Sequence, residues 1–455
     1  MRWLPAVLVL FAFSAFAQEE EEVAEETSDA GIYEEPSSEP DLAARVAALE
    51  EQLAETRLIT ERLRQQAEAQ SAVQVVFSGY IDVGFFAVGG NGSGVRKDYA
   101  RRVPNTSDIL NSWVLVGDPL STTINSRGDV ADLGDSRAIK FDPIHSQGRP
   151  SFLVNAVNLG LAGTIGDELS FHAMLDFLPR DALITGAAFG DFIDVKLAWA
   201  RWERDWSSVR LAISAGKFES LHGLEYRAQE APARLTVTPS LICRYTCGRP
   251  VGLKAQAWFL DGALEAAIAL TNGSTQQELF PWSNESDWNG FKTVHARVFG
   301  HIGNVMELTI SGAVGAQDRQ PDDTLMQFHA GAGARLTLGA MLFQAEFVGG
   351  RAPGKPSANV PCAAASCINY LGAYGLFGYK IAYVVSPYAR VDWRQSSMRS
   401  GRNYAYESNE LRATIGVRVE PTKRLMLKAE YTFNAELSGM PFDDDVFTSS
   451  AVVSW

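Results

Sequence analysis

Long apolar runs are missing from this sequence after its first few residues. The 455-residue chain is 46% hydrophobic. Beyond Phe16, however, no stretch approaches the roughly 20 apolar residues that a membrane-spanning helix needs. If a membrane holds this protein, helices do not hold it there.

Cysteine is also scarce. The 4 cysteines form two close pairs, Cys243 with Cys247 and Cys362 with Cys367, each in a segment expected to be a loop. In an exported protein such pairs predict local disulfides. A metal site is the alternative, but the pairs lie far apart in the sequence and no histidine accompanies either. We therefore expect neither a metal nor any other cofactor.

The few histidines form no catalytic pattern. Nucleophilic hydrolysis needs a Ser, Cys or Thr aligned with a base, and no histidine has such a neighbourhood in the sequence. The 6 histidines are His145, His172, His222, His295, His301 and His329. We assign no catalytic residue, and an enzyme is the least favoured function class.

Basic residues are in the minority, at 40 against 54 acidic ones, for a net charge of -14. The excess is concentrated at one end, because residues 1–72 hold 16 of the acidic and 5 of the basic groups. The remainder carries 38 acidic and 35 basic residues. This balance does not predict a nucleic-acid partner.

Residues 1–40 predict export and then a spacer. Arg2 precedes the apolar run Leu4–Phe16, and Ala15-Phe16-Ala17 is a small-x-small cleavage pattern, so residues 1–17 are expected to be a signal peptide. An uncleaved anchor is the alternative, although the run is short for one. Residues 18–40, rich in Glu, Ser and Pro, predict a flexible acidic linker.

Residues 41–72 carry a helical repeat. Mostly apolar residues recur at alternating spacings of four and three, a heptad pattern of about four repeats. They are Leu42, Val46, Leu49, Leu53, Thr56, Thr60, Leu63 and Ala67. The pattern predicts a short α-helical coiled coil, because one such helix is marginal alone. It does not choose between dimer and trimer, and a helix packed on the rim of the next domain is the alternative.

From residue 73 to Trp455 the period becomes two. In the segment 423–434, one face carries Leu425, Leu427, Ala429, Tyr431 and Phe433, and the other Lys428, Glu430, Thr432 and Asn434. A soluble sandwich would alternate in the same way. Three features favour an outer-membrane barrel: short connections that alternate with long polar ones, aromatic residues near strand ends, and a final strand that stops on Trp455. The predicted short connections are Gly166-Asp167, Asp261-Gly262, Leu338-Gly339 and Ser386-Pro387. Residues 73–455 thus predict an all-β transmembrane β-barrel of about sixteen antiparallel strands. The expected strand starts include Val73, Ser151, Val251, Asn409 and Val446.

One segment resembles a known family. Residues 214–225, Ser-Ala-Gly-Lys-Phe-Glu-Ser-Leu-His-Gly-Leu-Glu, look like the Gly-Lys-Phe…Gly-Leu-Glu stretch of the phosphate-selective porin O/P family, and 249–252, 260–264 and 270–273 resemble its next hairpin. The resemblance implies a trimeric channel whose third external loop folds into the pore. The family usually has Pro-Phe in place of Leu221-His222, and its phosphate-binding residues have no one-to-one match here. The resemblance therefore implies a channel more than it implies phosphate.

The expected function is that of an outer-membrane porin through which small hydrophilic solutes or ions diffuse passively. Expected partners are outer-membrane lipids, two further copies in a homotrimer and, through a periplasmic stalk, the cell wall. A structural barrel tied to the cell wall and a plugged or gated barrel are the alternatives. Two connections, 89–150 and 219–250, are long enough to be functional, and the first is a possible plug.

Strand parity predicts which side chains face the lumen. Candidate pore-lining cations are Lys254, Arg297, Arg335, Lys380, Arg390, Arg394, Arg412, Arg418 and Lys428. Carboxylates expected beside them include Asp82, Asp176, Glu307, Glu346, Asp392 and Glu430. Candidate residues of the constriction loop are Glu225, Arg227, Glu230 and Arg234. Salt bridges across a wet lumen are one interpretation, and an arginine strip over Pro387–Ala435 that attracts anions is the other.

Overall fold

The computed structural model describes residues 53, 56–62, 73–88, 150–177, 193–272, 290, 292–316, 326–353, 367–400, 403–437 and 445–455. The predicted signal peptide and linker, most of the long connection 89–150, and Cys362 lie outside these residues. Within the predicted coiled coil, residues 53 and 56–62 are helical. The coiled coil itself stays a prediction.

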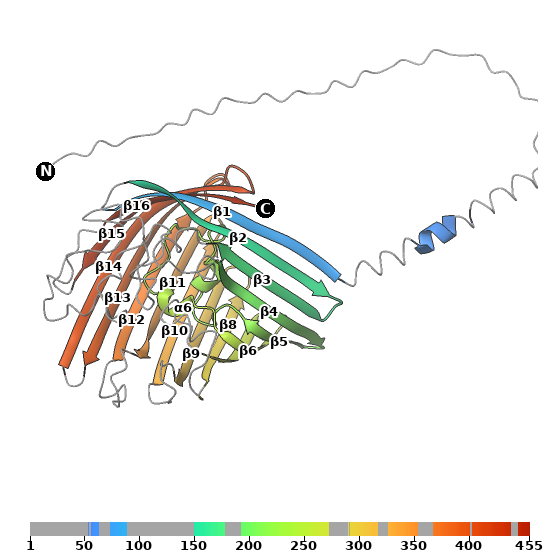
Figure 1. Ribbon diagram of the computed structural model, residues 1–455, viewed down its shortest axis with the longest axis horizontal. Coiled ribbons are helices and arrows are strands. Elements are labelled where there is room, and N and C mark those ends of the chain that lie inside the picture. The colour runs from blue at the N-terminus through green and yellow to red at the C-terminus, as the bar shows by residue number, and fades with distance from the viewer. Residues whose placement is uncertain are drawn as a thin grey trace, which may run out of the picture. The chain divides into compact units, whose positions relative to one another are not determined.

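Sixteen antiparallel strands close into one barrel, which confirms the predicted fold class (Figure 1). They are β1 (Val73–Val88), β2 (Ser151–Ile165), β3 (Leu169–Phe177), β4 (Ile193–Trp206), β5 (Val209–Lys217), β6 (Val251–Phe259), β7 (Leu264–Thr271), β8 (Thr293–Ile302), β9 (Met306–Ala316), β10 (Met326–Leu338), β11 (Met341–Pro353), β12 (Cys367–Tyr379), β13 (Val385–Ser400), β14 (Asn403–Val419), β15 (Leu425–Glu436) and β16 (Val446–Ser454). Each strand pairs with its sequence neighbours, and β1 pairs with β16. The sheet therefore has no free edge.

The last residue takes part in the closure. Trp455 donates its backbone N–H to the carbonyl of Gly79 at 3.1 Å, and Gly79 donates back to Trp455 at 3.3 Å. A Cβ at Gly79 would lie 2.6 Å from the Trp455 ring. Glycine at this position thus gives the indole room to lie across β1.

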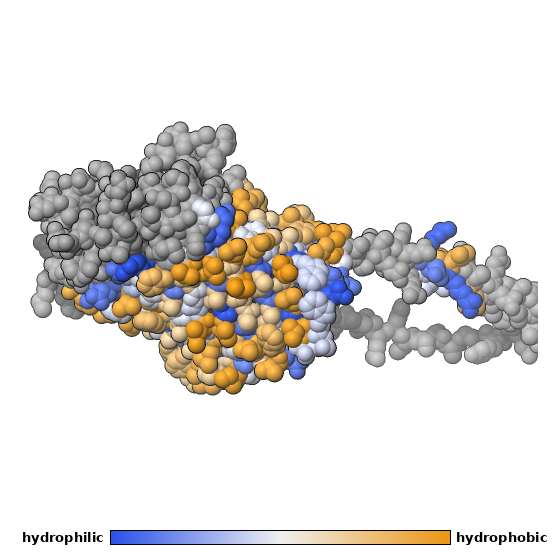
Figure 2. Space-filling model, turned by 90° about the horizontal axis from the view of Figure 1, so that it is seen from below, coloured by the Kyte–Doolittle hydropathy of each residue, from blue (hydrophilic) through white to orange (hydrophobic). Residues whose placement is uncertain are grey.

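The two faces of the wall differ sharply in polarity. On β14, Leu411 and Ile415 face outward with 38% and 55% of their surfaces exposed, whereas Arg412 and Thr414 between them are buried. The same alternation runs along the other strands, as expected for strands whose successive side chains point to opposite faces. Apolar side chains cover much of the outer surface (Figure 2). The interior is polar and charged.

Short turns gather at one end of the barrel, which also holds the start of β1 and the end of β16. One of these turns was placed wrongly by the sequence, which favoured Ser386-Pro387. The turn is 380–384 instead, with Ala382 and Tyr383 at φ 49° and 61°. The turn was missed because Ile381, Tyr383 and Val384 are apolar and lack the usual composition of a turn. As a correction, Lys380 lies in this turn, largely exposed, and not on the strand wall.

In the described part of the chain, no helix is both long enough and apolar enough to cross a membrane.

Candidate functional site

The connection between β5 and β6, residues 218–250, folds into the barrel and is called the lumen loop below. It has only two short helical turns, the 3-10 helix η3 (Glu225–Ala228) and α6 (Cys243–Thr246). In Figure 1 it lies within the ring of strands. Its buried apolar side chains include Phe218, Leu221, Leu224, Tyr226, Val237, Leu241, Ile242 and Tyr245. The sequence resemblance implied this inward fold.

Wall carboxylates bind the N–H groups of the lumen loop. An irregular segment inside a barrel has few backbone partners of its own, and buried N–H groups need acceptors. Glu346 of β11 accepts from the N–H groups of Leu224 and Glu225, both at 2.7 Å. Glu430 of β15 accepts from those of Val237 and Thr238, both at 2.8 Å.

Glycine is required where the loop meets Glu346. Gly223 has a φ of +68°, and a Cβ there would lie 2.0 Å from a Glu346 carboxylate oxygen. A side chain would therefore both strain the backbone and displace the carboxylate. This is the Gly of the Gly-Leu-Glu motif in the sequence.

Wall cations bind the carbonyl groups of the same loop. Arg390 of β13 donates to the carbonyls of Thr238 and Pro239 at 2.7 and 2.8 Å and to the Asp392 carboxylate at 2.8 Å. Lys428 of β15 donates to the carbonyl of Arg234 at 2.5 Å. Both side chains are buried, at 2% and 4% exposed. These cations hold the loop and do not face water.

Glu230 attaches the loop to a further part of the wall, on β1 and β4. Its carboxylate accepts from the hydroxyl of Tyr80 on β1 at 2.5 Å, from Lys196 on β4 at 3.0 Å and from Arg249 at 2.6 Å. Burial alone would raise the pKa of Glu230, but the cations Lys196 and Arg249 outweigh it and hold the pKa well below its ordinary value. Glu230 therefore stays ionised. With these contacts the loop is attached to β1 and β4 as well as to β11, β13 and β15.

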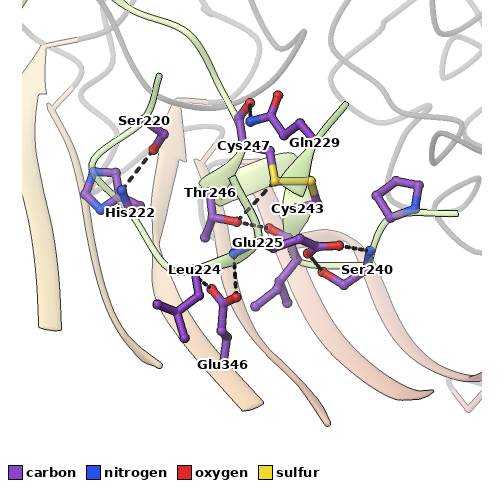
Figure 3. The surroundings of a disulfide bond; sticks show 12 residues. Ser220, His222, Leu224, Glu225, Gln229, Ser240, Cys243, Thr246, Cys247 and Glu346 are labelled. Carbon is purple, nitrogen blue, oxygen red and sulfur yellow. Dashed lines mark hydrogen bonds between the residues drawn. A yellow bond between two sulfur atoms is a disulfide. The ribbon is translucent and has the colours of Figure 1, made fainter. Parts of the chain in front are cut away.

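A disulfide stiffens the last third of the loop. It joins Cys243 and Cys247 at the two ends of α6 (Figure 3). Beside it, Ser240 donates its backbone N–H to Glu225 at 2.7 Å and also its hydroxyl. Glu225 and the two sulfur atoms lie close enough to form a metal ligand set. Because the sulfurs are joined to each other, however, they offer no thiolates to a metal.

Three histidines meet under the loop, which the sequence did not predict. His222 of the loop lies with its Nε2 3.1 Å from Nδ1 of His295 on β8, and its ring is 3.9 Å from that of His329 on β10. His295 is also 2.7 Å from the hydroxyl of Thr271. A hydroxyl beside a histidine can be a nucleophile and base, but Thr271 and His295 are buried at 1% and 0% exposed. A substrate has no access to this pair while the loop is in place.

Acid should loosen the lumen loop through His222. Burial, followed by the neighbouring His329, His295 and Arg297, holds the pKa of His222 well below its ordinary value. In the packed loop His222 is neutral. Its contribution to the stability of the packed loop is therefore complete above about pH 6.5 and falls by about 1.4 kcal/mol per pH unit below that value. We expect the loop to become more susceptible to protease between pH 7 and pH 5, and less so in His222→Gln. Equal pH profiles for both proteins would contradict this.

The remaining predicted lumen cations lie on two parts of the wall, one formed by β13 and β14 and the other by β6, β8 and β10. Arg394 and Arg412 are fully buried, and Arg394 forms an ion pair with Glu410 at 2.9 Å. Arg418 donates to the carbonyl of Arg234 in the loop and to Glu420. Lys254, Arg297 and Arg335 lie on the wall formed by β6, β8 and β10, where Arg297 donates to Tyr226 of the loop. In the predicted strip over Pro387–Ala435, Arg390, Arg394, Arg412 and Lys428 are therefore packed away from water, whereas Lys423 and Arg424 are exposed.

Two of the four predicted loop residues make the central contacts, and two lie nearer its surface. Glu225 binds Ser240 and Glu230 binds three donors, as described above. Arg227 is 41% exposed and reaches Glu307 of β9 at 3.2 Å. Arg234 contributes its carbonyl to Lys428 and Arg418. No pattern in the sequence indicated the wall partners of the loop, beyond their inward parity.

No family model matches the chain, and no curated protein matches it. Solved structures resemble it in fold. In vitro folded OmpT, an outer membrane protein of Vibrio cholerae, is 10% identical with a TM-score of 0.50, covering 84% of this chain and 98% of that one. The outer membrane channel DcaP of Acinetobacter baumannii is 12% identical with a TM-score of 0.49, covering 85% and 98%. The likeness to OmpT shows the shared barrel fold.

Proposed function

We propose that this chain is a bacterial outer-membrane channel through which small hydrophilic solutes or ions diffuse, past a lumen narrowed by residues 218–250. The observation that carries the proposal is a closed barrel with an apolar exterior and a charged interior. Lipid accepts a sheet only when no backbone group on its edge is left unpaired, and closure provides this. The fold likeness to an outer membrane protein of Vibrio cholerae agrees with that location.

The lumen loop favours a controlled passage over a wide pore. Sixteen-stranded barrels enclose an aqueous channel unless something occupies it. Here wall side chains of β11, β13, β14 and β15 bind one loop through its backbone, and β1 and β4 bind its Glu230 side chain. Such contacts fix the position of the loop, so the passage is set by the loop and by the wall that it leaves uncovered.

Membership of the phosphate-selective porin O/P family, a homotrimer and a periplasmic coiled-coil stalk over 41–72 are part of the proposal. The segment at 214–225 supports the first of these. The heptad repeat supports self-association, and an extended stalk could also reach the cell wall. A purely structural barrel is the second candidate, and the extensive attachment of the loop is the observation that favours it.

Planar-bilayer recordings in KCl test the channel. We expect stepwise currents, smaller than those of a sixteen-stranded barrel with an unobstructed lumen, because the loop occupies part of the cross-section. A chain lacking residues 18–72 is the control, and it should keep the same unit conductance, since the barrel is built without them. If correctly folded and inserted barrels carried no current, the channel would be rejected and the structural barrel favoured.

A further inference from the structure

One sector of the inner wall, partly covered by the lumen loop, combines cations with aromatic rings. It spans β4 to β8 and continues to Arg227 of the loop. The residues that form it, named the basic-aromatic strip here, are Trp199, Arg201, Arg210, Trp258, Phe299 and Arg227. The registers Asp205↔Arg210, Arg210↔Trp258 and Glu265↔Phe299 place the side chains of neighbouring strands beside one another.

Each arginine of the strip lies over a ring. The guanidinium carbon of Arg201 is 4.7 Å from the centre of the Trp199 ring, that of Arg210 is 4.3 Å from Trp258, and that of Arg227 is 5.0 Å from Phe299. Stacking holds a planar guanidinium by its face and leaves the N–H groups at its edge for a partner. That edge matches a carboxylate in geometry and charge.

Polar contacts fix the strip without neutralising it. Arg201 donates to the neutral side chains of Ser214 and Gln256, at 3.1 and 3.3 Å. Gln256 in turn donates to Glu265 at 3.0 Å. In the portion of the chain that the structure describes, no carboxylate lies within ion-pair distance of Arg201. This positive charge is therefore available to an anion.

Two arginines of the strip are also accessible, although Phe299 beneath Arg227 is only 2% exposed. The Arg210 and Arg227 side chains are 44% and 41% exposed, unlike the buried cations that hold the loop. Their carboxylates, Glu203 at 3.5 Å and Glu307 at 3.2 Å, engage one nitrogen of each guanidinium. Half-exposed ion pairs contribute little energy. An incoming carboxylate can thus compete for the remaining N–H groups.

We propose that the basic-aromatic strip binds small aromatic carboxylates as they pass through the barrel. The carboxylate would meet the guanidinium edges, and the flat ring of the solute would pack against Trp258. This inference rests on the proposed channel function and names a solute class for it.

Fluxes into proteoliposomes that contain the full chain test the inference, with benzoate, acetate and benzyl alcohol as probes. We expect benzoate influx to saturate and to exceed acetate influx, although benzoate is the larger ion, while benzyl alcohol shows no saturable component. In Arg201→Gln the half-saturating benzoate concentration should rise roughly tenfold, because a hydrogen bond to a charged group is lost. Trp258→Leu should lower the benzoate-to-acetate ratio without reversing charge preference.

Two substitutions on the outer face of the same strand are matched controls. Arg204→Gln and Trp206→Leu change residues of β4 that point away from the lumen and are 53% and 50% exposed, and neither should alter the benzoate-to-acetate ratio. Benzoate influx below that of acetate, or unchanged in both strip variants, would overturn the inference while KCl currents still supported a channel. Absence of KCl current from folded barrels would overturn the channel and the inference together.

Discussion

Replacing residues 219–249 with Asn-Gly should raise the single-channel conductance several-fold. Lys217 pairs with Val251, and Phe218 donates its N–H to the carbonyl of Pro250 at 3.1 Å, so a two-residue turn can join β5 and β6 at this point. Asn-Gly suits such a turn because both residues accept positive φ. The wall groups that bind the loop, such as Glu346 and Arg390, would then meet water, which satisfies them. The lumen would lose its only described obstruction.

The conductance of this shortened protein can be interpreted only if the protein is shown to fold. Circular dichroism and heat-dependent migration in detergent gels should match those of the parent barrel, since the replaced segment contributes no strand. Wild-type conductance from a barrel that passes both checks would show that the loop does not limit the passage.

Arg390→Met should destabilise the protein by about 3–5 kcal/mol, the usual cost of leaving one member of a buried ion pair without its partner. Arg390 is 2% exposed and bonds to Asp392 and to the carbonyls of Thr238 and Pro239. Methionine fills similar space but has no N–H group to donate to these partners. Equilibrium urea unfolding in lipid vesicles measures the change.

Two comparisons separate loop attachment from a general effect on the barrel. Arg204→Met removes an exposed cation from the outer face of β4 and should cost about 1 kcal/mol or less. In the barrel with Asn-Gly in place of 219–249, Arg390→Met should cost far less than in the parent, because the carbonyls are gone and Asp392 reaches water. An equal cost in both barrels would mean that Arg390 stabilises the wall and not the loop.

The strands were predictable because burial on one face leaves a period of two in the sequence. Predicted starts near Val73, Ser151, Val251 and Val446 coincide with those of β1, β2, β6 and β16. The beginning of β14 was missed, since Asn403 lies six residues before the predicted Asn409 in a polar stretch without alternation. The turn at 380–384 was missed for the opposite reason, because its residues are apolar.

The inward parity of Arg390, Lys428 and Glu430 was readable in the sequence, but their partners were not. Parity says which face a side chain occupies and nothing about what fills the space beyond it. Water in the lumen would have made these residues a charged pore lining. The lumen loop makes them ligands of its backbone instead.

The sequence by itself determined a sixteen-stranded barrel with an apolar exterior and charges inside, because alternation and connection lengths are local properties of the chain. Only the tertiary structure decided which charges hold the lumen loop, which histidines meet beneath it, and which arginines stay exposed over aromatic rings. Those outcomes depend on contacts such as Glu430 with Val237, between residues nearly two hundred positions apart. Strand period carries no information about such pairs, since the loop has no repeat and its course is set by the wall groups that satisfy its backbone.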